Sequence, residues 1–132
     1  MKTIVEVGAC LVTIAILVSC SGPNSREVHA AYVITSGGDA RAGHDAIRKY
    51  GCNACHTISG VPGADGLVGP PLAAFARRTF IAGSLPNTPE NLVEWVRHPE
   101  SIEPHTAMPA LALSEQQARD VAAYLYTLRG EP

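Results

Sequence analysis

The sequence predicts an all-α fold of three or four helices in one small domain. Three segments carry apolar residues at the 3.6-residue spacing of a helix, and each follows a residue that commonly caps a helix N-terminus. No segment gives a convincing pattern of paired strands. With 132 residues, of which 5% are aromatic, the chain provides one domain with a small apolar core.

The first helix is predicted to start after an N-cap at Asp39 and to run to about Tyr50. An aspartate at this position accepts hydrogen bonds from the free N–H groups of the first turn. Its apolar stripe consists of Ala42, Ala46, Ile47 and Tyr50. Gly51 and Cys52 follow at once, so the next motif continues from the end of this helix.

A glycine- and proline-rich segment separates the first helix from the next long one. Thr57 to Gly69 is expected to be loop, because it contains five glycine or proline residues that break helices. Pro71 to about Arg78 is expected to form a short helix. Ser84 to Asn87 is expected to be loop again.

Two further helices have clear start signals. Thr88-Pro89-Glu90 offers a cap, a proline at the first helical position and an acid near the positive end of the dipole. This helix is expected to stop at Pro99, and Glu100 to Ala112 to be an extended loop. Ser114 and Gln117 form a capping-box pattern that opens the last helix. The buried faces of the two helices are Leu92, Val93, Trp95 and Val96, and then Val121, Ala122, Tyr124, Leu125 and Leu128.

The N-terminus is typical of an exported lipoprotein. Residues 1–19 have a short positive start and an apolar run too short for a comfortable membrane span, which predicts a signal peptide. Leu17-Val18-Ser19-Cys20 resembles a lipobox, so Cys20 is the predicted lipidation site. The alternative is an uncleaved membrane anchor in which Cys20 has no special role. We expect residues 20–37 to be a flexible tether, residues 38–132 to be the folded domain, and the domain to be held at a membrane outside the cytoplasm, on the periplasmic face or in the cell envelope.

The charge of the chain is modest. The formal net charge is −2, and removing residues 1–19 takes away one lysine and one glutamate, so it stays at −2. No basic stripe indicates a nucleic-acid partner. Lys49 is the one lysine after residue 19, so long-range steering towards partners is expected to be weak. A tether would instead keep the domain close to membrane-bound partners.

The strongest motif is Cys52-Asn53-Ala54-Cys55-His56. A Cys-x-x-Cys-His run is the attachment signature of a c-type haem, with the two thiols forming thioethers and the histidine binding the iron. A redox dithiol or half of a zinc site are the alternatives. The first would need a βαβ context. The second needs four ligands, and the other cysteines, Cys10 and Cys20, lie in the N-terminal apolar segment.

If His56 is one axial ligand, the second must come from elsewhere. Met108 leads, because a thioether raises the haem potential and Pro109 restricts the backbone of the loop that carries it. The alternative for Met108 is a role in packing. His105 is the best rival ligand, and His44 and His98 are expected to be exposed helix residues. The second nitrogen of the His56 ring needs a partner, for which the carbonyl of Pro70 is our choice.

Together these motifs resemble class I cytochrome c. The resemblance covers about residues 38–129 and includes Gly69-Pro70-Pro71-Leu72, Met108-Pro109 and Tyr124-Leu125. It implies a small fold of helices around one covalent haem c, with Gly43 at the crossing of the first and last helices beside Tyr124. It also implies that Arg78 and Trp95 lie near the haem propionates.

A narrower resemblance is to the cytochrome c domain fused to subunit II of caa3-type terminal oxidases. It is carried by the segment from Leu85 to Leu92, then Trp95 and Met108-Pro109. The sequence departs from that subunit, because it shows no copper-binding domain, whose metal pair needs two closely spaced cysteines plus histidines. We therefore expect a free-standing single-electron carrier, not an enzyme. The expected partners are a terminal oxidase and, upstream, a quinol-oxidising complex or a dehydrogenase. A fixed haem subunit of a larger complex is the second reading, and a haem enzyme or gas sensor a distant third.

Overall fold

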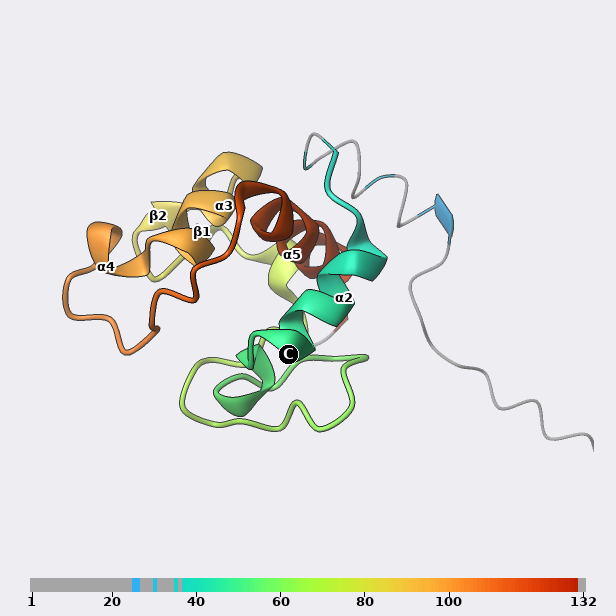
Figure 1. Cartoon of the computed structure of the whole chain (residues 1–132), viewed down its shortest axis with the longest axis horizontal. Coiled ribbons are helices and arrows are strands. Elements are labelled where there is room, and N and C mark those ends of the chain that lie inside the picture. Colours follow the sequence, from blue (N-terminus) through green and yellow to red (C-terminus); the bar gives the residue numbers. More distant parts are fainter. Residues whose placement is uncertain (1–24, 27–29, 31–34, 36, 131–132) are drawn as a thin grey trace, which may run out of the picture.

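The computed structural model describes residues 25–26, 30, 35 and 37–130. The predicted signal peptide, Cys20 and most of the predicted tether lie outside the described residues. Figure 1 shows a helical domain in which α2 (Ala40–Lys49) and α5 (Glu115–Thr127) cross, with α3 (Pro89–Arg97) on the other side of α5. The predicted all-α class is confirmed. No helix in the described part of the chain is long and apolar enough to cross a membrane.

The first and last helices begin where the sequence predicted. The Asp39 carboxylate accepts hydrogen bonds from the backbone N–H groups of Arg41 at 2.7 Å and Ala42 at 3.4 Å. Ser114 and Gln117 form the full capping box, each side chain accepting from the other's backbone N–H. These caps satisfy N–H groups that have no partner within the helix, and so fix where each helix starts.

The crossing of α2 and α5 depends on Gly43. A Cβ atom at this position would lie 1.9 Å from the Asp120 carbonyl oxygen and 3.1 Å from Tyr124 Cβ. No side chain fits there, so the two backbones meet directly. The Asp120 side chain, 8% exposed, also accepts a hydrogen bond from the Asp39 N–H at 2.9 Å. The predicted small residue at the crossing is therefore confirmed, with Asp120 as a second contact.

The described residues just before α2, which are Thr35, Gly37 and Gly38, pack on α5; we call them the strap. Thr35 is fully buried, and a Cβ atom at Gly38 would lie 2.2 Å from the Arg119 carbonyl oxygen. Gln116 donates from Nε2 to the Gly37 carbonyl at 3.2 Å and to Asp120 Oδ1 at 2.8 Å. Residues 35 and 37, which fall in the predicted tether, are thus part of the packed structure.

The middle of the chain is more regular than predicted. Pro99 does not simply end the preceding helix. α3 ends at Arg97, and Pro99 is the first residue of a short helix, α4 (Pro99–Ile102), which extends into the segment from Glu100 that was expected to be loop. Proline suits this position, because it has no N–H to leave unpaired. The short helix expected from Pro71 to Arg78 is only a 3₁₀ turn, η2 (Phe75–Arg77).

One prediction about strands was wrong. A two-stranded antiparallel sheet joins β1 (Phe80–Ile81) to β2 (Leu85–Pro86), in a segment read as free of strand pairing and partly as loop. The turn between the strands places Ala82 and Gly83 at positive φ. Two-residue strands are too short to give a periodic pattern, so the sequence offered no signal for them.

Tyr126 ties this middle segment to α5. Its hydroxyl donates to Asn87 Oδ1 at 2.9 Å, and Asn87 Nδ2 donates in turn to the carbonyls of Phe75 at 3.2 Å and Arg78 at 3.0 Å. Burial, with a smaller contribution from the Glu90 charge, raises the pKa of Tyr126 from its ordinary value near 10 to about 12. The hydroxyl therefore remains a donor in the folded protein at alkaline pH.

The raised pKa of Tyr126 predicts how stability responds to alkali. Since the folded protein holds this proton more tightly than the unfolded chain, the stability from Tyr126 is complete below pH 10 and is lost as the pH rises from 10 towards 12. At about pH 8, Tyr126→Phe should lower the free energy of unfolding by about 1 kcal/mol through the lost hydrogen bond. Nearer pH 12 the difference in unfolding free energy between the variant and the wild type should become smaller. Urea unfolding followed by tryptophan fluorescence measures it, and a constant gap would contradict the assignment.

Candidate functional site

The attachment turn extends directly from the C-terminal end of α2. Gly51 takes a left-handed conformation, with φ 75°, and redirects the chain into the 3₁₀ turn η1 (Cys52–Ala54). The backbone N–H groups of Cys55 and His56 both donate to the Cys52 carbonyl, at 3.3 and 3.0 Å. The two cysteines and the histidine are therefore held on a single turn. Both thiols are half-buried and free, and burial raises the pKa of the Cys52 thiol.

His56 is held by one hydrogen bond to the backbone. Its Nδ1 lies 2.8 Å from the Pro70 carbonyl oxygen, the partner expected from the sequence. A carbonyl can only accept, so Nδ1 must carry the proton and donate. The lone pair of the neutral ring is then on Nε2, on the far side of the imidazole. Such a ring is oriented to give one nitrogen to a metal.

Gly69 makes room for this imidazole. A Cβ atom there would lie 2.3 Å from His56 Cε1 and 2.6 Å from Nδ1, so any side chain would collide with the ring. The Gly69 N–H also donates to the Cys55 carbonyl at 2.8 Å. Gly66 is equally close to the turn, because its Cβ would lie 2.5 Å from the Ala54 carbonyl oxygen. The sequence indicated Gly69 only as part of a Gly-Pro pair and missed both contacts, which join residues far apart along the chain.

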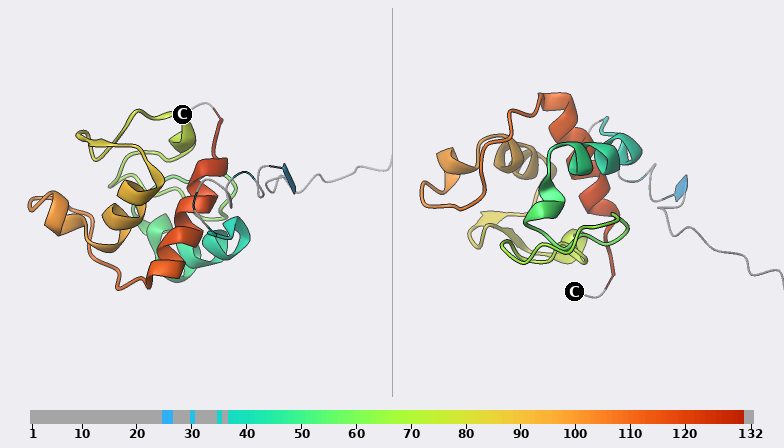
Figure 2. Two further views of the ribbon diagram at one scale, coloured as in Figure 1. Left: turned by 90° about the horizontal axis from the view of Figure 1, so that it is seen from above. Right: turned by 60° about the horizontal axis from the view of Figure 1, so that its bottom comes forward.

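The candidates for the second axial position differ in burial. Met108 lies between α4 and α5, half-buried against the hydrophobic core, and its N–H donates to Thr106 Oγ1 at 3.2 Å. Figure 2 shows this segment running along one side of the molecule before it enters α5. His105 and His98 are exposed. His44 is not the exposed residue expected: it is half-buried, with its Nδ1 3.2 Å from Asp45 Oδ1.

Arg78 and Trp95 occupy different settings. The Arg78 guanidinium donates to the Pro71 carbonyl and lies 5.6 Å from the centre of the Phe75 ring. It is thus adjacent to the segment that holds His56. Trp95 lies on α3 and is half-buried at the edge of the hydrophobic core. The Arg78 side chain therefore contacts the segment that follows Pro70, whereas Trp95 packs against the hydrophobic core.

The donor set fits a porphyrin-bound iron. Among the described residues, no three or more histidine, cysteine or carboxylate groups are close enough to hold a bare metal ion. A single oriented imidazole and a half-buried thioether suit an iron whose four other ligands come from a porphyrin. Two free thiols on one turn beside that imidazole suit covalent attachment of the same group.

Known proteins are similar to this chain in sequence. The family model for cytochrome c matches residues 40–129. Over 91 residues, the chain is 35% identical to cytochrome c oxidase subunit 2 of Alkalihalophilus pseudofirmus (68% of this chain, 26% of the relative). It is 34% identical to cytochrome c oxidase subunit 2 of Bacillus sp. strain PS3 (66% and 26%). It is also 32% identical to cytochrome c-552 of Bradyrhizobium diazoefficiens (68% and 77%).

The matched region is the described helical domain, from the start of α2 to just beyond α5. The chain spans about a quarter of the length of the oxidase subunits it matches. It covers more than three quarters of cytochrome c-552. The chain therefore belongs to the cytochrome c family and is an electron-transfer c-type cytochrome with covalently bound haem c.

Proposed function

We propose that this protein is a membrane-tethered, single-haem electron carrier that delivers electrons to a terminal oxidase. The observation that supports it best is the orientation of His56, whose Nδ1 is 2.8 Å from the Pro70 carbonyl and whose Nε2 is left for iron. When bound, haem c supplies an iron that gains and loses one electron at a time. The residues of the chain attach the group, fix its axial ligands and set its surroundings.

Cys52 and Cys55 are the proposed attachment residues. Their two thiols would hold the porphyrin covalently as thioethers, so that the cofactor would not dissociate. Because both cysteines lie on the turn that continues from α2, the bonds join the cofactor to the same helix that crosses α5. His56 follows Cys55 directly and is the proposed first axial ligand. Arg78 and Trp95 are proposed to contact the propionates.

Met108 is the proposed second axial ligand. Its thioether is a soft donor that favours the reduced state and so raises the potential. It is half-buried, whereas the rival His105 is exposed. With both axial positions taken by side chains, no substrate needs to reach the metal. This supports the role of a carrier rather than an enzyme.

The oxidase as partner is supported by the relatives and by the surface. Two of the relatives are named as cytochrome c oxidase subunit 2. Beside the attachment turn, Leu67 and Val68 expose large apolar side chains, at 89% and 74% of their area. We propose that this pair contacts the partner through its apolar surface. Because Lys49 is the one lysine after residue 19, electrostatic steering should contribute little to the encounter. The tether, from a lipidated Cys20, would raise the local concentration of the domain outside the cytoplasm.

A fixed subunit of a larger redox complex is the second candidate. The likeness to oxidase subunits, which are parts of a complex, favours it. A mobile carrier separates from the oxidase during purification. A fixed subunit would instead copurify with it in constant stoichiometry.

Replacing Gly69 by alanine should disturb His56 alone among the proposed ligands. The new Cβ would lie 2.3 Å from His56 Cε1, so the ring must turn and its bond to Pro70 must weaken. We expect a loss of about 1–3 kcal/mol in unfolding free energy and an altered absorption spectrum. Gly130→Ala is the matched control, because its Cβ would meet nothing closer than 3.7 Å. If the two variants had the same unfolding free energy and the same absorption spectrum, Gly69 would not be needed to make room for the His56 ring.

Replacing Met108 by alanine tests the second ligand. Loss of the thioether should lower the reduction potential and open the site to carbon monoxide in the reduced protein. Absorption spectroscopy and a redox titration measure both effects. His105→Ala should leave the spectrum and the potential unchanged. An unchanged spectrum in Met108→Ala, with a changed one in His105→Ala, would transfer the role to His105.

The proposed carrier function is tested by comparing the whole protein with Cys20→Ala in respiring membranes. The wild type should remain with the membrane and support oxygen consumption by the terminal oxidase. The variant, without its lipid, should be released and should support a lower rate at equal abundance. Equal rates would show that the tether is dispensable. A wild type that never reduces the oxidase would reject the proposed acceptor.

A further inference from the structure

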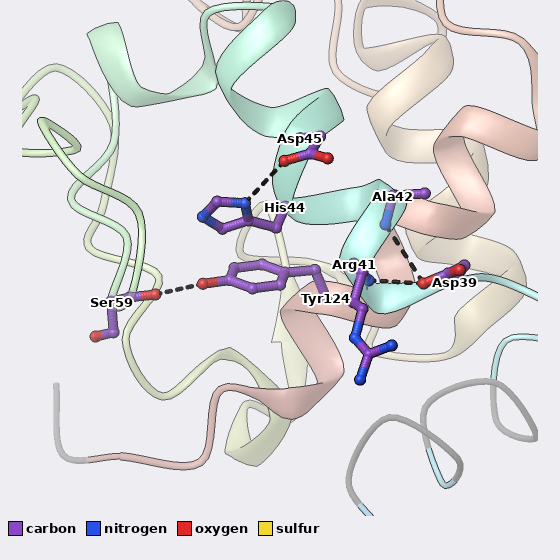
Figure 3. Close-up of polar contacts among 7 residues, drawn as sticks. All are labelled: Asp39, Arg41, Ala42, His44, Asp45, Ser59 and Tyr124. Atoms are coloured by element: carbon purple, nitrogen blue, oxygen red, sulfur yellow. Dashed lines mark hydrogen bonds and ion pairs between the residues drawn. The ribbon is translucent and has the colours of Figure 1, made fainter. Parts of the chain in front are cut away.

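We propose that Tyr124 is a positioning residue for His56, acting through the post-attachment loop, residues 57–66. This inference rests on the proposed role of His56 as an axial ligand. The Tyr124 hydroxyl donates to the Ser59 carbonyl oxygen at 2.8 Å, a bond that joins residues 65 positions apart. Figure 3 shows the phenol reaching from α5 to this loop.

The phenol ring itself is held firmly. Tyr124 is 2% exposed, and its Cβ lies at the Gly43 crossing. The His44 ring packs edge-on against it, with centroids 5.5 Å apart and planes at 61° (Figure 3). Because the ring cannot move freely, its hydroxyl is a fixed point to which the loop is attached. Burial also raises the pKa of Tyr124, so the hydroxyl keeps its proton.

Hydrogen bonds within the loop couple Ser59 to the other loop residues. The Ile58 N–H donates to the Ala64 carbonyl at 3.1 Å, and the Ala64 N–H donates to the Val61 carbonyl at 3.1 Å. The Thr57 hydroxyl donates to the Gly66 carbonyl at 3.1 Å. Ser59 lies inside this bonded unit. A displacement of Ser59 would therefore move the whole loop. The buried side chains of Ile58, Val61 and Ala64 would limit how far it moves.

Thr57 connects the loop to the partner of His56. Its carbonyl accepts a hydrogen bond from the Leu72 N–H at 2.8 Å, and Leu72 is two residues beyond Pro70. On the other side, Gly69 donates to the Cys55 carbonyl. The Pro70 carbonyl is thus held between two backbone bonds, one of which begins two residues before Ser59. The path from Tyr124 to the His56 ring consists of bonded groups throughout.

The consequence for electron transfer follows from the His56 hydrogen bond. A strong bond at Nδ1 makes the ring a better donor and favours the oxidised metal. If the hydrogen bond from Tyr124 to Ser59 is lost, the Pro70 carbonyl should be less fixed in position. The hydrogen bond from His56 Nδ1 should then weaken, which stabilises the reduced state and raises the reduction potential. The family likeness accounts for an aromatic ring at position 124. The hydroxyl adds a bond that ring packing alone does not need.

Tyr124→Phe tests the inference, because it keeps the ring and removes only the hydroxyl. Tyr126→Phe is the matched control: it is on the same helix, similarly buried and also loses one hydrogen bond, but to Asn87 instead of the loop. Both variants are studied as full-length, haem-loaded protein in detergent. The measurements are hydrogen exchange of the loop amides, exchange of the His56 Nδ1 proton in the reduced state, and the reduction potential.

Tyr124→Phe should speed exchange at Ile58, Ala64 and the His56 ring, whereas Tyr126→Phe should not. The equilibrium constant for reduction should rise about threefold in Tyr124→Phe, or roughly 30 mV for one electron. Equal exchange in the two variants would overturn the inference, as would an unchanged potential. If His56 is not a ligand, the spectrum of the wild type shows it, and the loop amides still decide whether Tyr124 holds the loop.

Discussion

The direct backbone contact between α2 and α5 at Gly43 is the constraint from which the rest of the structure follows. Because no side chain separates the helices there, their relative position is set by backbone atoms and is nearly rigid. One end of α2 continues into the attachment turn. α5 carries the side chains that reach the loops. The crossing thus places the cysteines and the loop that orients His56 in one frame.

α5 acts on both sides of the molecule through two tyrosines. Tyr124 and Tyr126 are two positions apart, so they leave the helix about 200° from one another. Tyr124 donates to Ser59 in the post-attachment loop, and Tyr126 to Asn87 beyond the hairpin. Each hydroxyl joins α5 to a segment that is distant in the sequence, by a hydrogen bond to a polar group of that segment. A domain with a small core gains order in this way where apolar packing is limited.

The starts of the long helices could be predicted from neighbouring residues, whereas the short elements between them could not. The caps at Asp39, Thr88 and Ser114 act within one turn, so the starts of the three long helices were predicted correctly. Pro99 indicates the end of a helix, although the same ring also suits the first position of the next one, as in α4. The β1–β2 hairpin was missed because its strands are too short to show a pattern.

At the site, the turn from Cys52 to His56 was readable as a motif. The Pro70 carbonyl was identified because the ring needs an acceptor and a Gly-Pro pair offers a rigid one. The contacts of Gly66 and Gly69, and the bond from Tyr124 to Ser59, join segments that only the fold brings together. Nothing in the residue types announces them. The burial of His44 against Tyr124 was hidden for the same reason.

The strap before α2 limits how far the chain can be shortened from its N-terminus without loss of stability. The family match begins at residue 40, which invites truncation at that point. Such a cut would remove the fully buried Thr35, the backbone of Gly38 packed on Arg119, and the N-cap Asp39, whose N–H Asp120 binds. The Asp120 carboxylate would then keep the hydrogen bond from Gln116 but lose the one from the Asp39 N–H, and the first turn of α2 would lose its cap. A water-soluble form that keeps native stability should retain the chain from Thr35 onwards.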